Sequence, residues 1–201
     1  IQFLNLFRYL TFRTGGAIMT ALFISFLLGP SLINWLKGQQ GNASNIREDV
    51  PETHLKKAGT PTMGGFLILL SITISTVLWA DIQNGSVWLV LFATVGFGAV
   101  GFADDFLKLT KRNSKGLPGR LKLLFQILIA AITDYWAMSM SGAPLSGALA
   151  VPFFKDLLIQ LGWFFIPFAV FVLVGASNAV NLTDGLDGLA IVPVMIAAGC
   201  F

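Results

Sequence analysis

Long stretches without a charged residue constrain this chain more than any other feature of its sequence. Four of them, with 22 to 27 residues each, cover Thr14–Leu36, Ala58–Ala80, Ile82–Ala103 and Leu157–Thr183. About 20 mostly apolar residues in a helix cross the hydrocarbon core of a bilayer. The composition agrees: 11% of the residues are charged, against about 25% in a soluble domain. The sequence therefore predicts an all-α fold, a polytopic bundle of transmembrane helices with the lipid bilayer as its surroundings.

We expect one integral membrane domain over residues 1–201, with about five complete spans and a truncated sixth. The fourth span carries Asp134 near one end, and we interpret this residue as a solvated helix-end charge. The chain has no initiator Met and Phe201 falls inside an apolar run, so we expect a fragment of a longer protein. The expected spans are 15–36, 62–80, 86–103, 121–139, 160–180 and 188–201.

The positions of Lys and Arg predict which loops face the cytoplasm. Ten of the 13 basic residues lie in Leu36–Pro61 and Asp104–Lys122, which the positive-inside rule places inside. Arg8 and Arg13 fall on the outer side, as a mild exception. The pI of about 9.2 thus reflects topology, and we expect no nucleic-acid partner. The expected cytoplasmic loops are 37–61, 104–120 and 181–188.

Counting spans from these loops brings three polar segments to the same side of the membrane. Gly59–Gly65, Asp104–Lys122 and Asn178–Gly188 all become cytoplasmic. This clustering follows from charge and span parity alone. It predicts a single site on the cytoplasmic face.

Asp104 and Asp105 end an apolar helix, where carboxylates at membrane depth suggest function. Adjacent side chains point about 100° apart on a helix, so the two do not share one ligand direction equally. One of them is suited to binding Mg²⁺, which favours one or two carboxylates plus substrate phosphates, and the other to acting as a base. The alternative is that both are solvated helix-end residues.

The segment Asn178–Gly188 carries two amides, two carboxylates and two glycines. Asn178, Asn181, Asp184 and Asp187 recur every three residues, which on a helix places successive members on one face. These groups suit a nucleotide base, a ribose and a metal ion. The alternative is a polar loop that caps a helix.

The turn Gly59–Gly65 follows Lys56 and Lys57 and opens the second expected span. Glycine-rich turns at a helix N-terminus present N–H groups to anions, although Thr60-Pro61-Thr62 is also an ordinary helix start. With the Asp pair and Asn178–Gly188, this turn resembles the polyprenyl-phosphate N-acetylhexosamine-1-phosphate transferases. The runs Arg47–His54 and Val151–Lys155 are similar to the branch of that family that makes lipid I.

This resemblance covers nearly the whole chain and implies a function. Phospho-MurNAc-pentapeptide is expected to pass from UDP-MurNAc-pentapeptide to undecaprenyl phosphate with Mg²⁺, giving lipid I and UMP for peptidoglycan synthesis. It implies ten helices in the intact protein, a homodimer, and a site on the cytoplasmic face of the bacterial inner membrane.

The resemblance also assigns residues. It implies catalytic roles for Asp104, Asp105 and Asp184, with Asp104 and Asp105 also holding metal. The family's main metal ligand and a histidine-rich loop would lie beyond residue 201, so we expect the 201-residue chain alone to be inactive. The implied substrate-binding residues are Lys57, Thr62, Lys108, Lys122, Asn178, Asn181, Gly185, Leu186 and Asp187.

Two other functions stay open at this stage. One is a sister transferase that uses UDP-GlcNAc as the donor. The other is an ion-coupled transporter, which would carry carboxylates near mid-membrane and repeat symmetry. Every carboxylate here lies near the end of an expected span and no repeat is evident, which favours the transferase.

Overall fold

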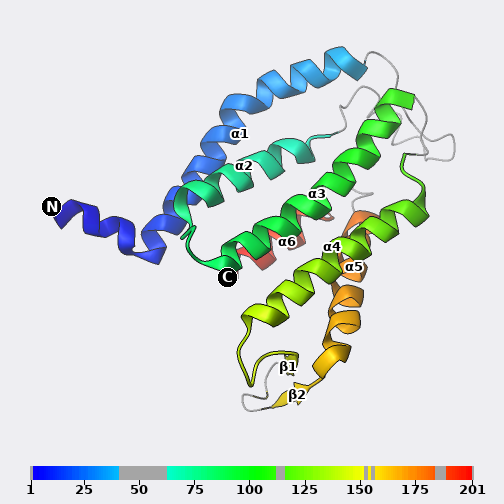
Figure 1. Ribbon diagram of the computed structural model, residues 1–201. Coiled ribbons are helices and arrows are strands. Elements are labelled where there is room, and N and C mark those ends of the chain that lie inside the picture. Colours follow the sequence, from blue (N-terminus) through cyan, green and yellow to red (C-terminus); the bar gives the residue numbers. More distant parts are fainter. Residues whose placement is uncertain are drawn as a thin grey trace. The chain divides into compact units, whose positions relative to one another are not determined.

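The computed structural model describes residues 2–40, 63–111, 116–151, 154, 157–183 and 189–200. Helices dominate these residues, which confirms the all-α fold of a multi-pass membrane protein (Figure 1). The chain divides into two compact units, Ile1–Lys122 and Leu123–Phe201.

The first unit is built on three antiparallel helices. A short 3-10 helix, η1 (Gln2–Arg8), leads into α1 (Leu10–Gln40), which is followed by α2 (Gly65–Trp79) and α3 (Gly85–Lys111). Figure 1 shows α2 between α1 and α3, and α2 packs against both. Because α2 and α3 run in opposite directions, the start of α2 lies beside the end of α3.

Small and polar side chains, together with Trp79, contribute to the contact between α1 and α2. The indole N–H of Trp79 donates to Thr20 Oγ1 at 2.9 Å, and the hydroxyls of Ser25 and Ser71 lie 3.2 Å apart. Trp79 also covers Gly16, where an added Cβ would lie 2.5 Å from the ring. Small residues that let backbones approach are typical of helix pairs in membranes.

Gly16→Ala is therefore expected to lower the melting temperature of the detergent-solubilised protein by several degrees. The added methyl has no room against Trp79, so the two helices must separate or the ring must move. Gly15→Ala is the matched control, because nothing lies within 4 Å of its added Cβ and both changes gain the same helix propensity. Equal melting temperatures for the two variants would contradict this packing.

Arg13 has a structural reason to lie on the outer side of the expected topology. Its Nε–H donates to the backbone carbonyl of Trp79, the last residue of α2. A cation at a helix C-terminus satisfies an orphan carbonyl and interacts favourably with the helix dipole. The positive-inside exception at this position thus coincides with a helix cap.

The second unit contains most of α4 (Gly119–Met140), then the strands β1 (Ala148–Ala150) and β2 (Leu158–Gln160). The strands pair antiparallel, with Leu149 opposite Ile159. The helices η3 (Gly162–Phe164), α5 (Phe165–Thr183) and α6 (Ile191–Gly199) follow. The sequence patterns did not indicate this hairpin, whose strands have only three residues each.

In the part of the chain that the structure describes, four helical segments are long and apolar enough to cross a membrane: Leu10–Gly38, Gly85–Lys108, Gly119–Met140 and Gly162–Thr183. In the expected span 62–80, the helix α2 has 15 residues. A helix of that length measures about 22 Å, less than the roughly 30 Å of a hydrocarbon core.

Asp134 is not the solvated helix-end charge that we inferred from the sequence. The residue is only 6% exposed, and its Oδ2 has no hydrogen-bond partner among the described residues. It belongs to the buried stripe of α4, with Gln126, Ala130 and Thr133. Asp134 is buried because it lies on this stripe, although it is close to the end of the helix.

Candidate active site at the end of α3

The last turns of α3 hold two carboxylates and an ammonium group in one cluster. Lys108 Nζ lies 2.6 Å from Asp104 Oδ2 and 3.0 Å from Asp105 Oδ1. The spacings are i,i+4 and i,i+3, which bring side chains together on a helix surface. The two carboxylates therefore share one cationic partner at unequal distances, although their side chains leave the helix in different directions.

Asp104 has a second anchor outside α3. The backbone N–H of Leu117 donates to Asp104 Oδ1 at 2.8 Å and ties the start of the next helical segment to α3. The Asp104 side chain is 14% exposed, against 38% for Asp105. Asp104 is thus the more constrained carboxylate, and Asp105 is the more accessible one.

Gly116 is part of this cluster, and the sequence interpretation missed it. Its backbone is in the left-handed region, with φ of +49°. A Cβ added there would clash with Asp104 Oδ1 and would lie 2.8 Å from Lys108 Cε. Only glycine meets both demands without strain. The signal in the sequence was a glycine in a basic loop, directly before Leu117-Pro118.

Lys122 also lies in the first unit, on the first turns of α4. It interacts electrostatically with Asp104, which adds positive potential at that carboxylate. Of the residues inferred from the sequence, the structure thus brings together Asp104, Asp105, Lys108 and Lys122.

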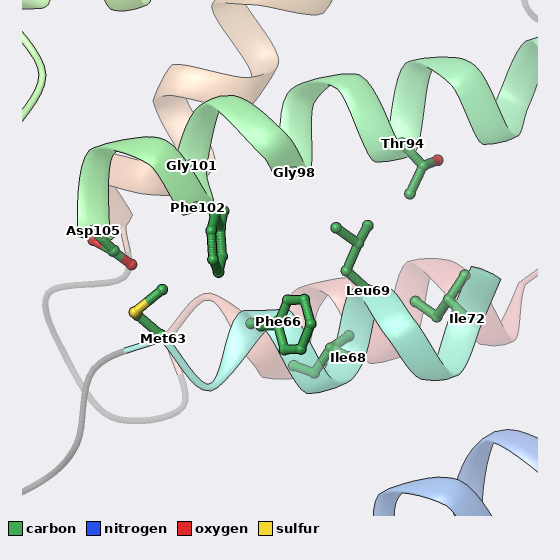
Figure 2. Close-up of a pocket in the computed structure, with 11 residues that line it drawn as sticks. Met63, Phe66, Ile68, Leu69, Ile72, Thr94, Gly98, Gly101, Phe102 and Asp105 are labelled. Carbon is green, nitrogen blue, oxygen red and sulfur yellow. The ribbon is translucent and has the colours of Figure 1, made fainter. Parts of the chain in front are cut away.

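A groove between α2 and α3 reaches the same cluster. Asp105 lines it together with Met63, which precedes α2 with a positive φ of 76°. Figure 2 shows the Asp105 and Met63 side chains near one another at one end of this groove. The end of the Gly59–Gly65 turn and the Asp pair, two of the three polar segments, therefore meet within the first unit.

The two asparagines of the third polar segment lie near the end of α5, in the second unit. Asn178 donates from Nδ2 to Gln126 Oε1 at 2.9 Å and to the carbonyl of Val174 at 2.8 Å. Gln126 is 4% exposed and joins α4 to α5 through this bond. Asn181 is exposed on the last turn of α5. Their role in one common site with the Asp pair stays a prediction.

Six of the residues inferred from the sequence lie outside the described residues. They are Lys57, Thr62, Asp184, Gly185, Leu186 and Asp187.

The cluster's donor set fits a hard divalent cation. Among the described residues, no three His, Cys, Asp or Glu side chains converge. Asp104 and Asp105 nevertheless each place one oxygen within 3.0 Å of a single cationic centre, Lys108 Nζ. Two carboxylates completed by phosphate and water oxygens are an ordinary environment for Mg²⁺. Asp104 and Asp105 are therefore the described residues that would hold such an ion.

The chain is similar to proteins of known classification. A model described as glycosyl transferase family 4 matches residues 87–201, more than half of the chain. A phospho-N-acetylmuramoyl-pentapeptide-transferase signature matches residues 57–69. A phospho-N-acetylmuramoyl-pentapeptide-transferase of Granulibacter bethesdensis is 63% identical over 198 residues, which cover 98% of this chain and 55% of the relative. The chain thus spans about half the length of that relative.

Proposed function

The chain belongs to glycosyl transferase family 4, and from this premise we propose that it forms part of a lipid I synthase. The reaction transfers phospho-MurNAc-pentapeptide from UDP-MurNAc-pentapeptide to undecaprenyl phosphate and releases UMP. The 63% identity to a transferase of that name and the signature match at residues 57–69 support this branch over the donor UDP-GlcNAc.

The observation that carries the proposal is the shared contact of Lys108 with Asp104 and Asp105. The reaction brings a phosphate monoester to a diphosphate, so both reactants are anionic. A divalent ion can replace the Lys108 ammonium between the two carboxylates, and the ammonium can then bind a phosphate. The ion and the ammonium together offset the repulsion between the two anionic substrates. The proposed Mg²⁺ would supply charge neutralisation at the transferred phosphoryl group.

The proposed step is a displacement at phosphorus. An oxygen of undecaprenyl phosphate forms a bond to the β-phosphorus of the donor, and the bond from that phosphorus to the bridging oxygen breaks. The bridging oxygen leaves with UMP. A phosphate monoester is largely ionised at neutral pH, with a second pKa of about 6, so positioning contributes more than removal of a proton.

The residues divide these tasks in our proposal. Asp104 and Asp105 would both hold the ion; Asp105, the accessible carboxylate, faces the substrates, while Asp104 is anchored by the N–H of Leu117. Asp184 completes the catalytic aspartates. Nucleotide and phosphate binding falls to Lys57, Thr62, Lys108, Lys122, Asn178, Asn181, Gly185, Leu186 and Asp187. We place this site on the cytoplasmic face of the bacterial inner membrane, in a homodimer.

Transfer of a labelled MurNAc-pentapeptide into the lipid fraction tests the proposal. The full-length protein in detergent, with undecaprenyl phosphate and Mg²⁺, is expected to produce a lipid with the mass of lipid I. Chelation by EDTA is expected to reduce the rate by at least about 10²-fold, the scale of losing one transition-state stabiliser, and added Mg²⁺ restores it. A rate that EDTA leaves unchanged would contradict the metal role of the Asp pair.

A further inference from the structure

Gln126 carries a buried amide that the proposed mechanism does not use. It lies on the buried stripe of α4 and is only 4% exposed. Its Oε1 accepts a hydrogen bond from Asn178 Nδ2 at 2.9 Å and so joins α4 to α5. Burying an amide between helices is unfavourable unless its polar atoms are hydrogen-bonded, and a leucine would fill similar space without that penalty. The bond to Asn178 is therefore the feature that distinguishes glutamine at this position.

The orientation of the Asn178 amide follows from its two partners. Nδ2 also donates to the backbone carbonyl of Val174 at 2.8 Å. A carbonyl oxygen only accepts hydrogen bonds, so the Asn178 atom that faces it must be the nitrogen. The Gln126 atom that faces the same nitrogen must then be an oxygen. Both N–H groups of the Asn178 side chain are thereby used, one for Val174 and one for Gln126.

The side-chain oxygen of Asn178 is left for a ligand. None of the described residues donates a hydrogen bond to Asn178 Oδ1, and the side chain is half-buried near the end of α5. In this orientation Asn178 accepts hydrogen bonds and does not donate them. UDP-MurNAc-pentapeptide carries donors in its uracil ring and its ribose, whereas undecaprenyl phosphate is largely ionised at neutral pH and has almost none. The oxygen therefore suits the nucleotide and not the lipid phosphate.

We propose that Gln126 is a positioning residue, which holds Asn178 with its oxygen directed at an N–H or O–H group of the uridine. The inference rests on the proposed function and adds a residue outside the three polar segments. The bond to Val174 lies within α5 and determines only which amide atom faces the backbone. The bond to Gln126 comes from another helix, so it also determines where the side chain lies.

The alternative is that this bond serves stability alone. Hydrogen bonds between polar side chains commonly join helices in membranes. A bond of that kind would change the melting temperature of the protein and would leave its affinity for one substrate relative to the other unchanged. The two interpretations therefore differ in substrate selectivity and in their dependence on Asn178.

Gln126→Met in the full-length protein tests the positioning role, because it keeps the length of the side chain and removes the acceptor. The KM for UDP-MurNAc-pentapeptide is expected to rise about tenfold, the scale of one lost hydrogen bond. The KM for undecaprenyl phosphate is expected to stay within a factor of about two, because that substrate does not meet Asn178. Gln126→Glu keeps an acceptor oxygen and is expected to restore most of the nucleotide affinity.

Thr133→Val is the matched control. Thr133 is buried on the same stripe of α4, and its hydroxyl donates to the carbonyl of Ile129 within that helix. The substitution also replaces a buried polar group with an apolar group of similar shape. Both KM values are expected to stay within a factor of about two, since no contact with α5 is lost.

A double-mutant cycle with Asn178→Ala separates positioning from stability. Once Asn178 is alanine, Gln126→Met is expected to cause no further rise in KM, because no amide remains to be held. The melting temperature is expected to fall for Gln126→Met alone, which leaves an N–H of Asn178 unpaired. In the Asn178→Ala background it is expected to stay constant or rise, because the same substitution then removes an unpaired acceptor.

Four results would overturn the proposal. They are an unchanged KM for UDP-MurNAc-pentapeptide in Gln126→Met, equal rises in both KM values, a rise that persists in the Asn178→Ala background, and a folded Gln126→Glu protein that behaves like Gln126→Met. If Gln126→Glu does not fold, the double-mutant cycle decides, because it does not use that variant.

A failure of the proposed function remains distinguishable from a failure of this inference. If the unsubstituted protein transfers no sugar, calorimetric titration with UMP measures nucleotide binding directly. An affinity that is about tenfold weaker in Gln126→Met and unchanged in Thr133→Val supports the role of Gln126. Equal affinities in all three proteins, or no binding of UMP by the unsubstituted protein, would overturn it.

Discussion

Asp105→Asn is expected to lower the turnover of the full-length enzyme by about 10²- to 10³-fold, the scale of removing one preorganised electrostatic group. The change keeps the shape of the side chain and removes its charge. Asp105 then no longer pairs with Lys108 at 3.0 Å and becomes a weaker ligand for a divalent ion. The rate of UMP release at saturating concentrations of both substrates measures the effect.

Asp81→Asn is the matched control for this prediction. Asp81 lies between α2 and α3, at the opposite end of α3, where its carboxylate accepts a hydrogen bond from the backbone N–H of Gln83 at 3.1 Å. An amide oxygen also accepts that bond, so turnover is expected to stay within a factor of two. A comparable loss of turnover in both variants would show that the result reports general damage to α3.

Gly116→Ala is expected to reduce turnover by about tenfold to 10²-fold and to lower the melting temperature. A left-handed conformation costs a residue with a Cβ about 1–2 kcal/mol, and the methyl here also collides with Asp104 Oδ1. Relief of that collision moves Asp104 away from Lys108 and Leu117. A small displacement of a catalytic group has a large effect on rate, so we expect a larger effect on turnover than on the melting temperature.

Gly119→Ala separates this effect from any loss of loop flexibility. Gly119 is three residues further on, begins α4, and has nothing within 4 Å of an added Cβ. It is expected to keep full turnover and a melting temperature at or above that of the unsubstituted protein. Equal turnover for Gly116→Ala and Gly119→Ala would contradict the contact between Gly116 and Asp104.

The membrane fold could be predicted because it depends on local properties of the chain. Charge-free runs of 22 to 27 residues require helices in lipid, where a segment must satisfy its own backbone hydrogen bonds. The β1–β2 hairpin could not be predicted in this way, because strands of three residues are too short to show an alternating hydrophobic pattern.

The candidate site could be predicted in its residue types and only partly in its contacts. Asp104, Asp105 and Lys108 lie within five residues, so helix periodicity brings them together. Gly116 and Leu117 lie outside α3, and no periodic pattern in the sequence reports their contacts with Asp104. Gln126 and Asn178 are 52 residues apart in sequence, and their hydrogen bond was missed for the same reason.

Asp134 shows where reasoning from span ends failed. A carboxylate near the end of an apolar run was taken as solvated, yet its side chain lies on the same helical stripe as Gln126 and Ala130. Burial in a bundle depends on the angular position of a residue, so proximity to the interface is a weaker guide than periodicity.

The choice of sugar donor tests the central claim most directly. The full-length protein in detergent receives undecaprenyl phosphate and Mg²⁺, with UDP-MurNAc-pentapeptide or UDP-GlcNAc in separate reactions. We expect UMP release with UDP-MurNAc-pentapeptide alone, lowered by about 10²- to 10³-fold in Asp105→Asn and retained in Asp81→Asn. Release with UDP-GlcNAc alone would contradict the lipid I synthase assignment, and release with neither donor would contradict phospho-sugar transfer itself.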